Sequence, residues 1–138
     1  MNREEIKHIL PHREPMLLVD EATVTDGLAT GTYSVRGDEW FLRGHFPDNP
    51  VVPGVILCEM MAQSACALLL EDAGAGMTPY FTSLDKVRFK HVVRPGDTIT
   101  FTCTITAQKG PFTFCQGKGH VDGKLCISGK FSFAVKEA

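Results

Sequence analysis

The sequence predicts an α+β fold in which an antiparallel sheet of about six strands packs around one long helix. Three observations lead to this prediction. The chain has 138 residues, 43% of them hydrophobic, which suffices for a single domain, 1–138, with its own core. Thirteen of the 16 residues from Val55 to Leu70 are apolar. The rest of the chain is a series of strand-like segments joined by short turns, which favours antiparallel pairing.

The first third of the chain contains a short helix and a hairpin. Asn2 can cap a helix from Arg3 to Leu10, which the following proline ends. Strand-like patterns then run from Met16 to Thr25 and from Leu28 to Val35. The Asp26-Gly27 pair between them is a strong signal for a tight hairpin turn.

An extended segment from Asp38 to Pro53 leads into the long helix. Its prolines disfavour both helix and sheet. Pro53 suits the first helical position because its missing N–H would have no partner there. The helix is expected from about Pro53 to Asp72, with Gly74-Ala75-Gly76 as its C-terminal stop.

Four more strands are expected after the helix: about Tyr80 to Val93, Asp97 to Ala107, Phe112 to Val121 and Leu125 to Val135. Each pair is joined by a turn that contains glycine. One curved sheet covers only one side of a helix that is apolar all round. A second copy of the chain, packed about a two-fold axis, is therefore expected to cover the rest; a monomer with an exposed apolar stripe is the alternative.

The composition excludes several function classes. Five cysteines without a CxxC pair are expected to be buried reduced thiols in the cytoplasm. No signal peptide is expected, and the long helix is too short and too polar for a membrane span. A net charge of -2 with scattered basic residues gives no support for a nucleic-acid partner. No histidine spacing fits a metal site. His12 is interpreted as a structural residue that holds its loop together with Arg13 and Asp20.

Three polar residues stand out near the long helix. Glu59 and Gln63 lie one turn apart on one helix face, where Gln63 is expected to support Glu59. His45 lies in the extended segment before the helix. Taken alone, Glu59 could equally be a structural carboxylate, and His45 an ordinary loop histidine. Burial disfavours the charged form of each, so together they can supply one acid and one base that move a proton between substrate atoms.

The start of the helix adds a third element. The amides of Gly54 and Val55 have no partner within the helix, and the helix dipole favours negative charge there. A thioester carbonyl bound at these amides would be stabilised as it becomes enolate-like. Gly54 has no side chain to obstruct its approach.

Several segments resemble motifs of one enzyme family. Gly44 to Ile56 (GHFPDNPVVPGVI), followed by Glu59 to Gln63 (EMMAQ), resembles the active-site signature of the FabZ-type 3-hydroxyacyl-[acyl-carrier-protein] dehydratases. The segments Leu10 to Asp20, Leu84 to Phe89 and Val93 to Asp97 are similar to other motifs of that family. The likeness spans nearly the whole chain in the expected order.

The resemblance implies a hot-dog fold and a homodimer with active sites at the subunit interface; family members are often trimers of such dimers. It implies that His45 and Glu59, from opposite subunits, form the catalytic pair, with the Gly54 amide on the thioester carbonyl. His45 would take the C2 proton of a (3R)-3-hydroxyacyl-[acyl-carrier-protein], and Glu59 would protonate the departing hydroxyl. The trans-2-enoyl product belongs to fatty acid biosynthesis, and neither a metal nor an organic cofactor is implied.

Three alternatives stay open. The related FabA-type dehydratase/isomerases carry Asp where Glu59 stands, which favours plain dehydration, although some relatives with Glu also isomerise the product. A hot-dog acyl thioesterase would use the carboxylate to activate water. A dimeric acyl-binding or structural subunit would keep the pocket without turnover. The His45-to-Glu59 motif disfavours the last two.

A basic strip is expected on one strand. Lys86, Arg88 and Lys90 alternate along it and so share one face. In an acidic protein this strip could dock an acidic acyl carrier protein. The alternative is a solvated strand face whose charges discourage edge pairing.

Overall fold

The computed structural model describes residues 1–70 and 76–137, and its elements follow the predicted order. They are α1 (Arg3–Ile6), β1 (Glu21–Thr25), β2 (Leu28–Ser34), the 3₁₀ turn η1 (Trp40–Leu42), α2 (Gly54–Leu70), β3 (Met77–Phe89), β4 (Thr98–Lys109), β5 (Phe112–Val121) and β6 (Lys124–Glu137). The six strands and the one long helix are as predicted. Asp72, Gly74 and Ala75, where the helix was expected to end, lie outside the described residues.

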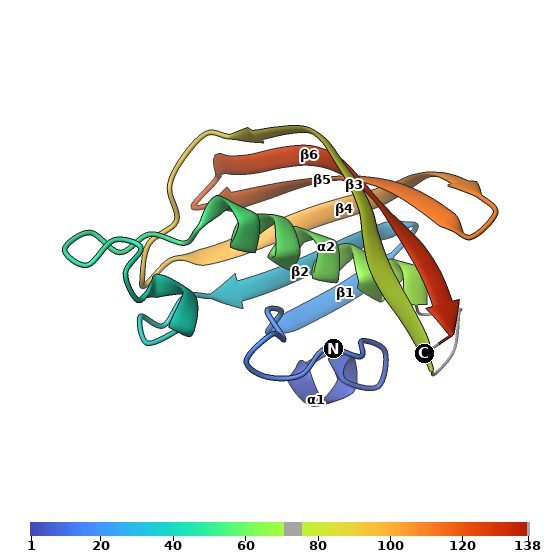
Figure 1. Cartoon of the computed structure of the whole chain (residues 1–138), viewed down its shortest axis with the longest axis horizontal. Helices are drawn as coiled ribbons and strands as arrows, with labels where there is room; N and C mark the ends of the chain where they lie inside the picture. Colours follow the sequence, from blue (N-terminus) through green and yellow to red (C-terminus); the bar gives the residue numbers. More distant parts are fainter. Residues whose placement is uncertain (71–75, 138) are drawn as a thin grey trace.

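All six strands form one antiparallel sheet in the order β1-β2-β4-β5-β6-β3, and α2 lies against one of its faces (Figure 1). The predicted hairpin is present, with Thr25 opposite Leu28. Asp26 and Gly27 have φ values of 52° and 76°, which a two-residue hairpin turn of this kind requires. The expected fold, a sheet around a long helix, is confirmed.

The N-terminal helix is shorter than predicted. It begins at the capped Arg3 but ends at Ile6 instead of Leu10. The guanidinium of Arg13 donates to the carbonyl oxygens of Lys7 at 3.0 Å and Leu10 at 2.8 Å. These bonds stabilise a turn in place of further helix.

The first strand is also shorter, because part of its predicted length binds the helix instead of the sheet. Only Glu21–Thr25 is strand. The N–H of Leu18 donates to Oε1 of Gln63 at 2.8 Å, and Nε2 of Gln63 donates to the carbonyl of Met16 at 2.7 Å. This stretch therefore connects the N-terminal segment to α2.

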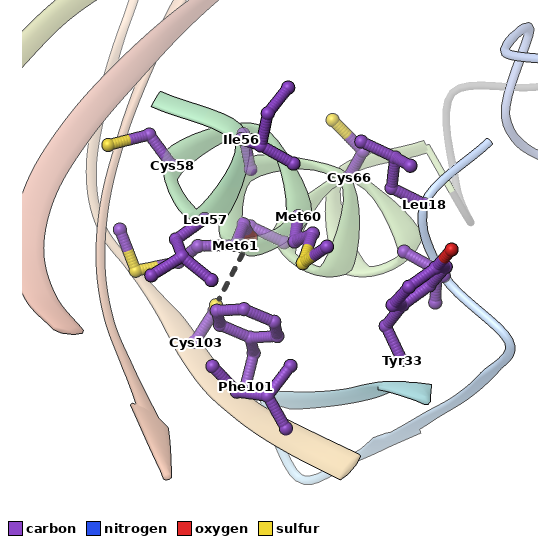
Figure 2. Packing of buried hydrophobic residues seen from close by; sticks show 14 of the residues in the cluster. Leu18, Tyr33, Ile56, Leu57, Cys58, Met60, Met61, Cys66, Phe101 and Cys103 are labelled. Carbon is purple, nitrogen blue, oxygen red and sulfur yellow. Dashed lines mark hydrogen bonds between the residues drawn. The ribbon is translucent and has the colours of Figure 1, made fainter. Parts of the chain in front are cut away.

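Close backbone approach allows α2 to pack on the sheet. A Cβ atom at Gly31 of β2 would collide with the side chain of Ser64. A Cβ atom at Gly117 of β5 would lie 3.0 Å from Cγ of Met61. Figure 2 shows Met60 and Met61 over Phe101 and Cys103 of β4, with the Cys103 thiol donating to the Met61 carbonyl at 3.5 Å.

The chain itself covers most of α2, so the expectation that a second copy is needed to bury this helix is wrong. Twelve of its 17 residues are buried in the single chain. Leu10, Leu17, Leu18 and Phe41, which lie outside the sheet and α2, belong to the same buried cluster. The sequence pattern did not reveal this cover because these irregular segments have no periodicity to match to a helix.

Among the strands, β3 carries the largest group of exposed apolar side chains. Tyr80, Phe81, Leu84 and Phe89 are all at least 40% exposed. Within the described residues β3 pairs only with β6, at one edge of the sheet.

All five cysteines are free and buried, as predicted. Burial raises the pKa of the Cys103 thiol and of the Cys115 thiol to about 12. Among the described residues, no helix is long and apolar enough to cross a membrane. Within the same residues, no cluster of three or more His, Cys, Asp or Glu side chains could hold a metal ion.

Candidate active site

Glu59 and Gln63, expected one turn apart on the same face of the helix, are in direct contact. Nε2 of Gln63 donates to Oε2 of Glu59 at 2.8 Å. The Gln63 side chain is buried, and its remaining hydrogen bonds go to the main chain at Met16 and Leu18. Because the Leu18 N–H needs an acceptor, the orientation of the Gln63 amide is determined, and Oε2 of Glu59 must accept a hydrogen bond from it.

Glu59 lines a cavity of about 170 Å³. One face of α2 lines part of this cavity, and strands β3 and β6 at the edge of the sheet line another part. Its lining residues are His12, Glu59, Ala62, Gln63, Cys66, Pro79, Tyr80, Phe81 and Phe133. A carboxyl group beside apolar side chains such as Ala62, Phe81 and Phe133 suits an acyl chain with a reactive polar head.

His12 also belongs to this cavity, which corrects the sequence interpretation of a clamp with Arg13 and Asp20. Nε2 of His12 lies 3.5 Å from Oε2 of Glu59. Asp20 instead binds Arg3 at 2.9 Å and Arg36 at 2.8 Å. The sequence held no signal for the His12 contact, because the irregular stretch around His12 has no periodic pattern that would place it against α2.

His45 is partly buried in the loop before α2, and its protonation pattern follows from its neighbours. Nδ1 lies 3.1 Å from the carbonyl oxygen of Val51. A carbonyl can only accept, so Nδ1 carries a hydrogen, and in the neutral ring the lone pair is on Nε2. The imidazole also stacks on Phe46, with ring centroids 4.3 Å apart. The bond to Val51 therefore fixes the ring orientation and makes Nε2 the basic nitrogen of the neutral tautomer.

Within one chain, His45 and Glu59 are not brought together. His45 is not among the residues that line the Glu59 cavity. The single chain thus contains each candidate group in a defined geometry but in separate places.

The first amides of α2 are free to bind a ligand. The amides of Ile56 and Leu57 donate to the carbonyl of Pro53, whereas those of Gly54 and Val55 have no hydrogen-bond partner in the described part of the chain. A Cβ atom at Gly54 would lie 3.0 Å from the ring of Phe89. Glycine at this position therefore also allows Phe89 of β3 to lie over the helix start.

The three residues of the predicted basic strip do not share one regular face. A register shift between Asp85 and Arg88 interrupts the alternation, and Lys86 has a φ of 52°. Lys86 lines a hollow of about 440 Å³ together with Lys118 and Lys130, on the face of the sheet opposite α2. Arg88 and Lys90 flank Phe89 in the sequence, and their side chains alternate with the Phe89 ring, which is the one that lies over the start of α2.

Comparison with known proteins identifies clear relatives. Residues 10–130 match the FabA-like domain family. The chain is 45% identical to the 3-hydroxyacyl-[acyl-carrier-protein] dehydratase FabZ of Clostridium perfringens, over 98% of this chain and 99% of that protein. It is 44% identical to FabZ of Caldicellulosiruptor bescii, with coverage of 98% and 99%. Its identity to FabZ of Oenococcus oeni is 42%, with coverage of 99% and 100%.

Solved structures resemble the chain in fold at low sequence identity. The dehydratase heterocomplex ApeI:P of Xenorhabdus doucetiae superposes with a TM-score of 0.83 at 20% identity, covering 96% of this chain and 91% of that chain. A hypothetical thioesterase of Streptococcus pneumoniae, solved with coenzyme A, superposes with a TM-score of 0.65 at 14% identity, covering 85% of each chain. These likenesses establish the hot-dog fold and carry no argument about the reaction.

Proposed function

Since the chain belongs to the FabZ-type family of 3-hydroxyacyl-[acyl-carrier-protein] dehydratases, we propose that His45 and Glu59 carry out the dehydration as base and acid. The protein is a lyase of fatty acid biosynthesis that removes water from a 3-hydroxyacyl-[acyl-carrier-protein]. The observation that carries the site assignment is the Glu59 carboxyl group, which Gln63 holds in a cavity lined by both polar and apolar side chains.

The geometry suggests how each group acts on a (3R)-3-hydroxyacyl thioester. Nε2 of His45 takes the proton from C2, and the Val51 carbonyl stabilises the resulting imidazolium through Nδ1–H. The enolate-like oxygen binds the free amides at Gly54 and Val55. Glu59 gives its proton to the C3 hydroxyl, the C3–O bond breaks, and water leaves with the trans-2-enoyl thioester as product. Proton exchange with solvent restores both groups.

The separate positions of His45 and Glu59 support a site shared between two subunits. We place the homodimer contact along β3, because this 13-residue edge strand carries exposed aromatic and aliphatic side chains. Pro79, Tyr80 and Phe81 of the same strand line the Glu59 cavity. A second copy packed on β3 would border that cavity and could supply its own His45.

The substrate is presented by an acyl carrier protein, which the curated relatives name in their activity. The apolar part of the cavity wall, which includes Ala62, Cys66 and Phe133, would hold the acyl chain. Arg88 and Lys90, on either side of Phe89 in the sequence, would face the acidic carrier. The five buried free thiols fit a reducing compartment, and we place the protein in the cytoplasm.

The test is hydration of crotonyl-[acyl-carrier-protein], the reverse reaction. Loss of enoyl absorbance and mass spectrometry of the product should show 3-hydroxybutyryl thioester, with no thiol released. His45→Ala and Glu59→Gln should each lower kcat at least about 100-fold while the chains stay folded. Thiol release would instead indicate a thioesterase, a shifted double bond an isomerase, and a lack of turnover an acyl-binding subunit.

Mixed dimers test the shared site. A dimer of one His45→Ala chain and one Glu59→Gln chain contains one intact site if the pair comes from opposite subunits. Random mixing of the two inactive variants should then restore about a quarter of wild-type activity, since half of the dimers are mixed and half of their sites are intact. No recovery after mixing would place both residues in one subunit.

A further inference from the structure

We propose that His12 is a positioning residue of the active site, which together with Gln63 holds Oε2 of Glu59 as a hydrogen-bond acceptor, so that Glu59 delivers its proton from Oε1. The proposal rests on the acid role of Glu59 in the proposed function. It assigns a task to a histidine that the sequence analysis interpreted as structural.

The two carboxyl oxygens of Glu59 have different surroundings. Oε2 lies 2.8 Å from Nε2 of Gln63 and 3.5 Å from Nε2 of His12. Among the described residues, none donates a hydrogen bond to Oε1. One oxygen is thus held by the protein, and the other is left for the substrate.

The other hydrogen bonds of Gln63 determine that Gln63 is the donor and Oε2 of Glu59 the acceptor in the bond between them. The Gln63 amide cannot be turned over, because its oxygen accepts from the buried Leu18 N–H and its nitrogen donates to the Met16 carbonyl. Its second N–H therefore points at Oε2. A protonated carboxyl group has a single O–H, and a hydrogen on Oε2 would face this N–H. The acid proton is accordingly placed on Oε1.

His12 directs a second N–H donor toward Oε2 of Glu59. Its Nδ1 atom is buried and has no hydrogen-bond partner among the described residues. A hydrogen on Nδ1 would be a buried donor without an acceptor, so the neutral ring carries its hydrogen on Nε2, the nitrogen that faces Glu59. The 3.5 Å separation is longer than an ordinary hydrogen bond. Catalytic contacts of this kind commonly shorten when substrate binds.

The geometry has a functional consequence. With Oε2 bonded to Gln63 and facing His12, which closes on it when substrate binds, the carboxyl group keeps its proton-bearing oxygen toward the substrate, and no reorientation is needed in the transition state. Loss of His12 should therefore reduce kcat more than it changes KM.

The experiment compares two replacements of His12 in the full-length protein with crotonyl-[acyl-carrier-protein]. His12→Gln keeps an N–H donor at a similar reach, whereas His12→Leu fills the space without one. We expect His12→Leu to lower kcat about tenfold with KM within twofold of wild type, and His12→Gln to recover at least half of the loss. His8→Leu, at an exposed histidine beyond α1, is the matched control and should leave both parameters unchanged.

A second measurement separates positioning from a structural role. In the Glu59→Gln background no acid proton remains to be positioned, so adding His12→Leu should lower the residual kcat by less than twofold. Equal kcat for the Leu and Gln variants, or the same tenfold loss in the Glu59→Gln background, would overturn the proposal. These outcomes are distinct from failure of the proposed function, which would show as an inactive wild type.

Discussion

Gln63 joins the acid Glu59 to the N-terminal segment: its amide donates to Oε2 of Glu59 at 2.8 Å, and its other hydrogen bonds hold the main chain at Met16 and Leu18. The residue is 1% exposed. A single side chain therefore both orients the carboxyl group and attaches the segment that covers α2. Stability and catalysis are coupled at this position.

Replacing Gln63 by Leu should reduce both the stability of the fold and the catalytic rate. The Leu18 N–H and the Met16 carbonyl would lose their partner while buried, which should lower the free energy of unfolding by about 2–4 kcal/mol. Urea denaturation measures this change. Gln116→Leu, at an exposed position of β5, is the matched control and should change stability by less than about 0.5 kcal/mol. Similar losses for the two variants would contradict the coupling described here.

The contact between Gly31 and Ser64 determines how closely α2 approaches β2. A Cβ atom at Gly31 would collide with the Ser64 side chain. Gly31→Ala should therefore lower the free energy of unfolding by about 1–3 kcal/mol. Adding Ser64→Gly removes the colliding atoms, so the double variant should be more stable than the sum of the two single changes predicts. Additive losses in urea denaturation would show that the strain lies elsewhere.

The buried thiols should be unreactive in the folded protein. Burial raises the pKa of Cys103 from 9.0 to about 12, so its thiolate fraction at neutral pH falls about a thousandfold. Burial also raises the pKa of the other four cysteines. A disulfide reagent should label all five thiols at once in urea but only slowly without it. Rapid labelling of Cys103 in native buffer, identified by mass spectrometry, would contradict this burial.

Charge reversal tests the carrier-protein surface. Arg88 and Lys90 flank Phe89, whose ring contacts the start of α2, whereas Lys86 lies past the register shift beside Lys118. Arg88→Glu with Lys90→Glu should raise KM for crotonyl-[acyl-carrier-protein] at least about tenfold and leave KM for crotonyl-pantetheine unchanged, because only the carrier is acidic. Lys86→Glu is the matched control, with little expected effect on either KM. An equal rise for both substrates would argue against docking here.

The sequence predicted the regular parts of this fold well, because their patterns are local. The bounds of β5 and the two-residue turn of the first hairpin agree with the structure. The contact of Glu59 with Gln63 followed from helix geometry alone.

The errors lie where contacts between irregular segments decide the structure. Met16 and Leu18 look like a strand but bind Gln63. His12 meets Glu59, although nothing in their sequence surroundings relates the two. The cover on α2 was assigned to a second chain, because the burial supplied by the irregular N-terminal segment has no signature in a single sequence.

The ion pairs of the N-terminal segment should make stability depend on acid pH. Glu14 binds Arg3 at 3.1 Å and Lys7 at 3.2 Å. Its own backbone N–H, then Arg3 and Lys7, lower its pKa from 4.5 to about 2. A carboxyl group whose pKa is lower in the folded state stabilises the fold above its unfolded pKa, and this contribution disappears as the pH falls through the folded pKa. The stabilisation by Glu14 should therefore be complete above pH 4.5 and vanish between pH 4.5 and about 2.

A double-mutant cycle isolates this contribution. Glu14→Gln and Lys7→Met, alone and together, give the coupling between the two side chains from urea denaturation at several pH values. The coupling should be favourable at pH 7, smaller in high salt because both groups face solvent, and absent near pH 2. Glu14→Gln should likewise differ from wild type in stability at pH 7 and converge with it in acid. A coupling of the same size at pH 2 and pH 7 would show that hydrogen bonding of the uncharged groups, and not their charge, holds the segment that carries His12.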